Sequence, residues 1–454
     1  MQDSRPQPPQ GALGQPDGSL VWRVWAPLSA AVSLVTFPDG LRRGTAMAPE
    51  GGGYFVHRQL PVAQGLPYAF KLGDGRDYPD PASRWQPHGV HRPSAVFFPQ
   101  SYRWSDAAWR GVARDELVIY ELHVGAFTPE GTLEAIIPRL PQLLALGVTA
   151  VELMPVAQFA GDRDWGYDAV YPYAVQNSYG GPTALLRLVD AAHQAGLAVI
   201  LDVVYNHFGP EGNYAARYGP YFTDRYRTPW GEAVNYDGPQ SDAVRQFVVD
   251  NARMWVRDFH LDGLRLDAVQ TIYDAGPRHI LAEIQAAVRR EATRAGRPVH
   301  VIAESNQNDV RLIRPSRRGG CGLDGVWSDD FHHAVHALLT GERDGYYMDF
   351  GEPAQVAKAL NEAFVYDGCY SAFRRRRHGS RAGATDRTRF VVCIQNHDQV
   401  GNRALGDRLG ALVAPAAQRL ACGLLLLSPC VPLVLTSEPQ YLLCHTAMSL
   451  PTGA

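Results

Sequence analysis

The sequence has no excess of charge of one sign, and this absence excludes several kinds of partner. Its 454 residues carry 43 basic and 46 acidic side chains, which gives a formal net charge of −3. Without an overall positive field, the chain is not expected to bind nucleic acid or an anionic membrane, and a neutral substrate fits better. The run Arg374 to Arg377 is the one basic cluster, and we interpret it as a solvated loop.

The features of secreted and zinc-bound proteins are also missing. The six cysteines form no C-x-x-C pair and lie at Cys321, Cys369, Cys393, Cys422, Cys430 and Cys444. This spacing argues against a zinc site and a disulfide framework, and free thiols in a reducing cytoplasm are expected. Residues 1–18 are polar and rich in proline and glycine, with no apolar signal segment. We therefore expect a disordered tail over 1–18 and a cytoplasmic location.

No stretch has the length and continuity of a membrane span. Residues 420–437, LACGLLLLSPCVPLVLTS, come closest, but Pro429 and Pro432 interrupt them near the middle. A bilayer core requires about 20 residues of helix. We expect instead a buried helix that ends near Ser428 and a buried strand that begins at Val431.

The hydrophobic periodicity changes once along the chain. Over residues 19–98, short alternating stretches such as LVWRVWAP and GYFVHRQL are separated by Gly, Pro and Asp turns, which is typical of an immunoglobulin-like β-sandwich. A linker is expected over 99–115. After it, β-branched runs alternate with amphipathic segments of helix length, the βα signature of a parallel sheet.

Eight candidate strands predict an α/β fold with a (β/α)8 barrel over residues 116–438. The alternative is an open doubly wound sheet, but no G-x-G-x-x-G motif or phosphate-binding loop follows any strand. The strands are expected at LVIYELHV from Leu117, AVELMPV from Ala150, AVILDVV from Ala198, GLRLDAV from Gly263, HVIAES from His300, GVWSDD from Gly325, FVVCIQN from Phe390 and VPLVLTSE from Val431.

Polar residues gather where these strands end. In a barrel of this kind the loops after the strands build the active site, so chemistry is expected at these ends. In chain order the residues are His123, Asp202, Asn206, His207, Arg265, Asp267, Glu304, Asp329, Asp330, His397 and Asp398.

Three carboxylates from three strand ends suit cleavage of a glycosidic bond, which needs one ionised and one protonated carboxyl group. Arg265 precedes Asp267 by two residues on one strand, so both point to the same face and Arg265 would hold Asp267 ionised. Glu304 follows an apolar run among other acids, so we expect a raised pKa suited to a proton donor. Each residue alone is more often a helix cap, a loop residue or a structural ion pair, and only the joint pattern favours catalysis.

Four motifs resemble the signature regions of the α-amylase superfamily. They are DVVYNH (202–207), GLRLDAV (263–269), IAE (302–304) and QNHD (395–398), in that order. The resemblance implies a retaining mechanism with Asp267 as nucleophile, Glu304 as general acid/base and Asp398 as stabiliser of the transition state. It also implies that the N-terminal sandwich is of a glucan-binding type.

The same resemblance implies roles for residues around the carboxylates. His207 and His397 would hydrogen-bond the sugar at the cleavage point, and Arg265 would orient Asp267. Tyr167, in the stretch WGYDAVYPY, would stack on that sugar ring, although a core tyrosine beneath a loop is the alternative.

Three longer stretches resemble a narrower family, the malto-oligosyltrehalose trehalohydrolases. They are PDPASRWQPHGVHRPS, VWSDDFHHAVH and IQNHDQVGNRALGDRL. The family cleaves the α-1,4-glucosidic bond next to the terminal trehalose unit of maltooligosyl trehalose and releases trehalose. The residues that we expect to bind substrate are Tyr167, Asp202, His207, Arg265, Leu266, Ala268, Val269, Gln270, Asp329, Asp330, Phe331, His332, His333, His397, Gln399, Val400, Gly401 and Asn402.

Two other functions remain open. Glycogen branching enzymes share the four regions and the sandwich, although the combination of DDFHH and HDQVGNR favours the hydrolase. A protein of another class, a non-catalytic glucan-binding protein inactivated by truncation, is the second alternative. No cofactor and no metal is expected, although related amylases use the residue matching Asn206 as a calcium ligand. A maltooligosyl trehalose synthase is the expected pathway partner.

The end of the chain departs from the family pattern. Thr436 and Ser437 replace a Met-Gly step, Glu438 keeps one acid position, and residues 439–454 diverge. The closing helix of the barrel and a C-terminal β-sandwich are therefore expected to be missing. Apolar sheet surface left uncovered costs about 25 cal/mol per Å², so we expect reduced stability.

Overall fold

Two antiparallel sheets form the N-terminal part of the protein, whose computed structural model describes residues 8–435. One sheet has the strand order β1-β2-β6-β5, and the other has β4-β3-β7-β8 with β9 added to β7. The ring of Trp22 in β2 meets that of Tyr68 in β7 edge-on at 6.1 Å, so aromatic side chains from both sheets fill the core. The strands are β1 (Gly11–Gly14), β2 (Leu20–Trp25), β3 (Ser33–Thr36), β4 (Arg43–Ala46), β5 (Ala48–Gly51), β6 (Tyr54–Gln59), β7 (Pro67–Lys71), β8 (Asp77–Tyr78) and β9 (Ser94–Ala95).

Strand β1 contradicts the prediction of a disordered tail over residues 1–18. It pairs antiparallel with β2, from Gly11 opposite Arg23 to Gly14 opposite Leu20, and its Ala12 is buried. The pairing gives β2 a hydrogen-bonded neighbour on what would otherwise be an open sheet edge. Its sequence, GALG, has no alternation of polar and apolar residues, so the strand carries no local signal. The sandwich therefore begins before residue 19, while residues 1–7 lie outside the described part of the chain.

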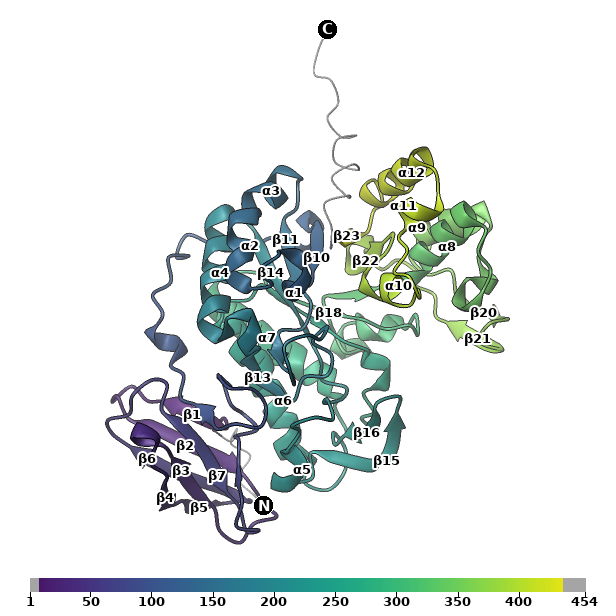
Figure 1. Ribbon diagram of the computed structural model, residues 1–454. Coiled ribbons are helices and arrows are strands. Elements are labelled where there is room, and N and C mark those ends of the chain that lie inside the picture. Colours follow the sequence, from purple (N-terminus) through teal and green to yellow (C-terminus); the bar gives the residue numbers. More distant parts are fainter. Residues whose placement is uncertain (1–7, 436–454) are drawn as a thin grey trace.

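Eight parallel strands close into a barrel in chain order, which confirms the predicted (β/α)8 fold class. The closure is made by β23, which pairs with β10 through Leu433 opposite Ile119. Figure 1 shows the barrel beside the N-terminal sheets. The strands, all within the segments predicted, are β10 (Ile119–Leu122), β11 (Ala150–Leu153), β14 (Ala198–Val203), β17 (Gly263–Leu266), β18 (His300–Ala303), β19 (Gly325–Trp327), β22 (Phe390–Cys393) and β23 (Val431–Leu435).

The helices follow the strands less regularly than eight identical units would. The predicted segment from Pro182 forms α4, and Gly196 ends it in the left-handed conformation at φ 86°, which glycine adopts without strain. Between β18 and β19 the structure has short 3-10 turns and no α-helix. The α-helices are α1 (Val124–Phe127), α2 (Leu133–Ile136), α3 (Leu140–Ala145), α4 (Gly181–Ala195), α5 (Ala215–Tyr218), α6 (Ser241–Asp258), α7 (Ile280–Ala295), α8 (Asp329–Thr340), α9 (Pro353–Glu362), α10 (His397–Gly401), α11 (Leu409–Leu412) and α12 (Pro415–Leu426).

Three small hairpins lie in the segments between barrel strands. Two are in the loops that follow β11 and β14, on the side on which chemistry is expected, whereas the third comes after α8 and α9. The basic run from Arg374 lies in the last hairpin, with Arg375, Arg376 and Arg377 exposed, in agreement with a solvated loop. The hairpins are β12 (Ala157–Gln158) with β13 (Tyr171–Val175), β15 (Phe222–Thr228) with β16 (Gly231–Val234), and β20 (Asp367–Ser371) with β21 (Arg376–Gly379).

The apolar segment from Leu420 forms the end of α12 and the strand β23, as predicted. The helix is not buried as expected, because Leu420 is 59% exposed and Leu427, just after its end, is 88% exposed. Within residues 8–435, no helix combines the length and apolar character needed to cross a membrane. Glu438 and the predicted divergent tail over 439–454 lie outside the described residues.

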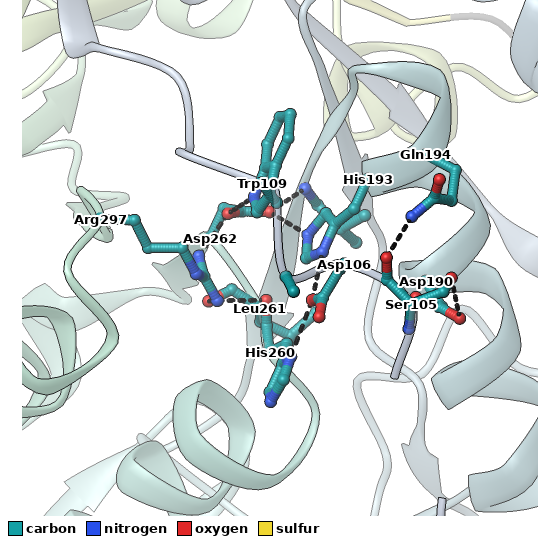
Figure 2. Close-up of polar contacts among 12 residues, drawn as sticks. Ser105, Asp106, Trp109, Asp190, His193, Gln194, His260, Leu261, Asp262 and Arg297 are labelled. Carbon is teal, nitrogen blue, oxygen red and sulfur yellow. Dashed lines mark hydrogen bonds and ion pairs between the residues drawn. The ribbon is translucent and has the colours of Figure 1, made fainter. Parts of the chain in front are cut away.

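A buried polar network joins the linker to the barrel at the N-terminal ends of its strands (Figure 2). We call it the linker clamp, and it consists of Asp106, Trp109, His193, His260, Asp262 and Arg297. Asp262, just before β17, accepts hydrogen bonds from Trp109 Nε1 at 2.8 Å, from His193 Nε2 at 2.9 Å and from Arg297. Asp106 of the linker is bonded to Nδ1 of His193 at 2.9 Å and to Nδ1 of His260 at 2.8 Å.

The stability of the protein should depend on the linker clamp. Replacing Asp262 with Ala leaves Arg297 and His193 without their buried acceptor, and breaking such a network costs about 3–5 kcal/mol. We expect the free energy of unfolding, measured by urea titration, to fall by that amount. The matched control is Glu134→Ala, which removes a surface ion pair whose side chains are 52% and 56% exposed; its effect should stay below about 1 kcal/mol. Equal losses in both variants would contradict this role.

Candidate active site

The polar residues predicted from the strand ends meet at one mouth of the barrel. Asp202 and Arg265 are register partners on the neighbouring strands β14 and β17. Glu304 directly follows β18, Asp329 begins α8 after β19, and Asp398 lies in the first turn of α10 after β22. Parallel strands direct their C-terminal ends to the same side of a barrel, so residues far apart in the sequence become neighbours.

The guanidinium group of Arg265 is at the centre of the site. Its Nη1 donates to Asp202 Oδ2 at 2.7 Å and to Asp267 Oδ1 at 2.9 Å, and its Nη2 lies 3.7 Å from Glu304 Oε2. The residue is fully buried and packs over the ring of Trp327 at 4.4 Å. One positive charge therefore faces three carboxyl groups and offsets part of their negative charge in a buried site. The predicted contact between Arg265 and Asp267 is present.

Both oxygens of Asp267 have a hydrogen-bond donor. Oδ1 accepts from Arg265, and Oδ2 accepts from Asn206 Nδ2 at 3.1 Å. The side-chain oxygen of Asn206 is in turn 3.2 Å from Nδ1 of His207, whose ring stacks on Trp230 at 4.4 Å. Asn206 thus holds the carboxylate and the histidine. Within residues 8–435, no cluster of three or more His, Cys, Asp or Glu residues has the arrangement of a metal site.

Glu304 is held as a proton donor. Its carboxyl group accepts a hydrogen bond from the backbone N–H of Ala268, which has a left-handed conformation at φ 40° that alanine rarely adopts. Burial, together with the negative charges of Asp267, Asp398 and Asp329, raises the pKa of Glu304 to about 8, although Arg265 acts in the opposite direction. The raised pKa expected from the sequence is therefore present, and the group is protonated at neutral pH.

Tyr167 connects two sides of the site. Its hydroxyl donates to Asp202 Oδ2 at 2.7 Å and lies 2.7 Å from Nε2 of His397. The ring stacks on that of His397 at 5.3 Å, so one of its faces is already covered. The hydroxyl and one ring face thus take part in the protein's own network, in addition to any contact of Tyr167 with a sugar.

The accessible part of the site lies along α10. The carboxylate side chain of Asp398 is 49% exposed, and Gly401 and Asn402 are exposed. Trp165, itself 43% exposed, lies so close to Gly401 that a Cβ on that glycine would stand 2.1 Å from the indole ring. Four other residues expected to bind substrate are half-buried, namely Gln270, Asp329, Gln399 and Val400.

Three residues expected to bind substrate have side chains that are almost completely buried, so their contact with substrate stays a prediction. Leu266 is 0% exposed, and Phe331 and His332 are each 1% exposed, because they point into the packing between strands and helices. His332 bonds the Tyr347 hydroxyl at 2.7 Å and the carbonyl of Ile394, and burial lowers its pKa to about 3. These side chains pack in the protein interior next to the residues that form the site.

Asp330 is also used internally. Its Oδ2 accepts from the backbone N–H of Val365 at 2.6 Å, from that of Tyr366 at 2.9 Å and from Asn308 Nδ2 at 2.7 Å. This carboxylate fixes the loops around α8, and its contact with substrate stays a prediction. Ala268, Val269 and His333 are buried at the edge of the same region, with 6%, 4% and 8% exposed.

Two buried acids were missed from the sequence. Glu121 in β10 and Glu152 in β11 are register partners, so both side chains project into the barrel. Glu121 bonds His397, whereas both carboxyl oxygens of Glu152 are buried without a hydrogen-bond partner. A signal was present, because each is the only charged residue in an otherwise apolar strand, where acids are rarely buried without a reason.

Comparison with known proteins agrees with this geometry. The family model for the catalytic domain of alpha amylases matches residues 67–228. Malto-oligosyltrehalose trehalohydrolase of Saccharolobus solfataricus is 49% identical over 93% of the chain and 73% of the relative. A solved structure from Salmonella typhimurium, assigned to the alpha amylases, superposes with a TM-score of 0.88 at 41% identity, covering 94% of this chain and 73% of the other.

The branching enzymes are more distant. A 1,4-alpha-glucan branching enzyme of Corynebacterium jeikeium is 30% identical over 74% of this chain and 51% of its own length. The similarity to the trehalohydrolase is both higher and longer, which favours the hydrolase of the two alternatives left open by the motifs.

Replacing Glu304 with Gln should stabilise the protein at alkaline pH. The pKa of Glu304 is raised to about 8 in the folded state, whereas a glutamate in an unfolded chain has a pKa near 4.3. Between these values the folded state holds a proton that the unfolded state has lost, so the stability contributed by the protonated carboxyl is lost as pH rises to 8. A glutamine has no such linkage. We expect the variant to exceed the parent by about 4–5 kcal/mol at pH 8 and to match it below about pH 4.

The measurement is the free energy of unfolding as a function of pH. The control is Glu130→Gln, which makes the same chemical change at an exposed position. If the curves of parent and Glu304→Gln ran parallel over the whole range, the carboxyl would not be protonated in the folded protein.

Proposed function

The chain belongs to the malto-oligosyltrehalose trehalohydrolase family of the α-amylase superfamily, and from this premise we propose that it cleaves the α-1,4-glucosidic bond next to the terminal trehalose unit of maltooligosyl trehalose. The observation that carries the proposal is the shared contact of Asp202, Asp267 and Glu304 with the buried guanidinium of Arg265, in a chain this similar to a trehalohydrolase. The reaction releases trehalose and a shortened glucan.

The first step forms a covalent glycosyl-enzyme. Asp267, held by Arg265 and Asn206, attacks the anomeric carbon, while Glu304 gives its proton to the departing glycosidic oxygen. The pKa of about 8 keeps Glu304 protonated at neutral pH for this step. Asp398, whose carboxylate is the most exposed of the three, faces the positive charge that develops on the sugar.

The second step restores the enzyme. Glu304, now ionised, takes a proton from a water molecule, which attacks the glycosyl ester and frees Asp267. Because each step inverts the anomeric carbon, the product keeps the α configuration. Arg265 stays charged throughout, so the site contains a fixed positive charge as the carboxyl groups change their protonation.

The proposed setting is a cytoplasmic pathway from glucans to trehalose. The substrate is a neutral α-glucan, which agrees with the net charge of −3, and the scattered cysteines favour a reducing compartment. A maltooligosyl trehalose synthase would supply the substrate. The non-catalytic alternative is disfavoured by the completeness of the carboxylate set.

Product analysis tests the activity. Incubation with maltotriosyl trehalose should yield trehalose and maltotriose, whereas amylose should gain no branches. Glu304→Gln should lower kcat by about 10²–10⁴-fold, the usual contribution of a general acid. On α-maltotriosyl fluoride, whose leaving group needs no proton, the same variant should still form a covalent adduct on Asp267, visible in the intact mass. New branches in amylose without free trehalose would reassign the protein to the branching enzymes, and glucan binding without any product would favour the non-catalytic alternative.

The rate should also follow the ionisation of Glu304. A general acid with a pKa of about 8 is protonated below that pH and loses its proton above it, so the alkaline limb of kcat/KM should have its midpoint near pH 8. A profile that falls already at pH 5–6 would show that Glu304 is not the proton donor.

A further inference from the structure

A buried ion pair lies behind the reacting groups, formed by Glu121 of β10 and His397 of α10. Oε1 of Glu121 is 2.6 Å from Nδ1 of the histidine, and Oε2 accepts from the backbone N–H of the same residue at 3.1 Å. Glu121 is 0% exposed and His397 is 4% exposed. The glutamate therefore fixes both the ring and the first turn of α10.

The hydrogen bonds around His397 determine where its protons are. Asp202 Oδ2 accepts one hydrogen bond from Arg265 and a second from the hydroxyl of Tyr167, which has only one proton to donate. That hydroxyl can therefore only accept from Nε2 of His397, 2.7 Å away. Nδ1 faces the acceptor Glu121. Both ring nitrogens thus carry a proton, and the ring is an imidazolium cation.

The surroundings of His397 contain one other cation and several acids. Arg265 of β17 opposes the positive charge on the ring, while the carboxylates favour it. The rings of Trp165 and Trp327 lie at 5.8 Å and 6.4 Å and exclude water from it. The titratable groups that face the ring are Glu121 of β10, His123 after β10, Glu152 of β11, Tyr167 after β11, Asp202 of β14, Arg265 of β17 and Asp398 of α10.

We propose that Glu121 is a positioning residue for the reaction, which keeps His397 doubly protonated and so places a fixed positive charge beside Asp398. Nε2 of His397 is 3.6 Å from Asp398 Oδ1, close enough to orient that carboxylate when the oxocarbenium-like state forms. The proposal rests on the function proposed above, since it gives Asp398 a role in that reaction.

The electrostatics agree with the geometry. Burial alone would lower the pKa of His397, but the charge and hydrogen bond of Glu121, with a contribution from Asp398, raise it to about 9. At the neighbouring Glu152, burial and the charge of Glu121 raise the pKa of the carboxyl well above its ordinary value, so this group is neutral.

The test compares three variants of the full chain. Glu121→Gln removes the charge at nearly the same volume, Glu121→Asp keeps the charge, and Glu152→Gln replaces the neutral neighbour as a matched control. In the parent, the alkaline limb of kcat/KM should be limited by Glu304. In Glu121→Gln the proton on His397 is lost first, so the limb should move to lower pH by at least about one unit, toward the ordinary histidine value of about 6.5.

The controls separate charge from packing. Glu121→Asp should lower kcat yet keep the limb near that of the parent, and Glu152→Gln should leave it unchanged. A limb that stays in place in Glu121→Gln, or that moves equally in Glu121→Asp, would overturn the proposal, since a purely structural role alters rate and folding without moving this limb.

A direct measurement is independent of activity and of the folding of any Glu121 variant. Nitrogen NMR of the parent, labelled at histidine and assigned by the signal lost in His397→Gln, should show two protonated ring nitrogens at pH 7. A neutral tautomer there would refute the assignment of Glu121. If the parent released no trehalose while its His397 were doubly protonated, the proposed function would fail and the ion pair would stand.

Discussion

The buried guanidinium of Arg265 is the interaction on which the active site depends. It faces Asp202, Asp267 and Glu304, and the ring of Trp327 covers it. Three carboxyl groups gathered in a low-dielectric barrel mouth would repel one another when ionised, and their pKa values would rise. One permanent cation at their centre lets at least one of them stay ionised as nucleophile while another holds a proton as acid, which is the division that glycosidic cleavage requires.

A second cation extends the same principle to the part of the site around Asp398. His397, paired with Glu121, lies beside Asp398, and Tyr167 connects it to Asp202 and so to Arg265. The reacting groups thus rest on a continuous polar network in the barrel interior. Its buried acids weaken the fold, because burial raises the pKa of Glu304 to about 8 and that of Asp329 to about 7. The stabilising polar contacts lie at the opposite end of the barrel, where the linker clamp binds the linker.

Much of this could be predicted from local patterns. All eight barrel strands, α4 with its terminal glycine, and the gathering of Asp267, Glu304 and Asp398 at strand ends followed from short apolar runs and from what comes after them. Other features of the structure could not be predicted from local patterns. Strand β1 has no local signal, and Leu266, Phe331 and His332 lie within informative motifs yet face the packing. Membership in a motif does not specify the direction in which each side chain points.

The sequence by itself determined the order of the elements and the residue types available to the site, because periodicity and turn residues are local properties of a chain. Only the tertiary structure decided which charges meet. Glu121 and His397 are separated by 276 positions and Tyr167 and His397 by 230, yet each pair is in hydrogen-bond contact. Closure of the barrel pairs β10 with β23, whose other neighbour is β22, and the resulting burial affects the protonation of the groups that meet there.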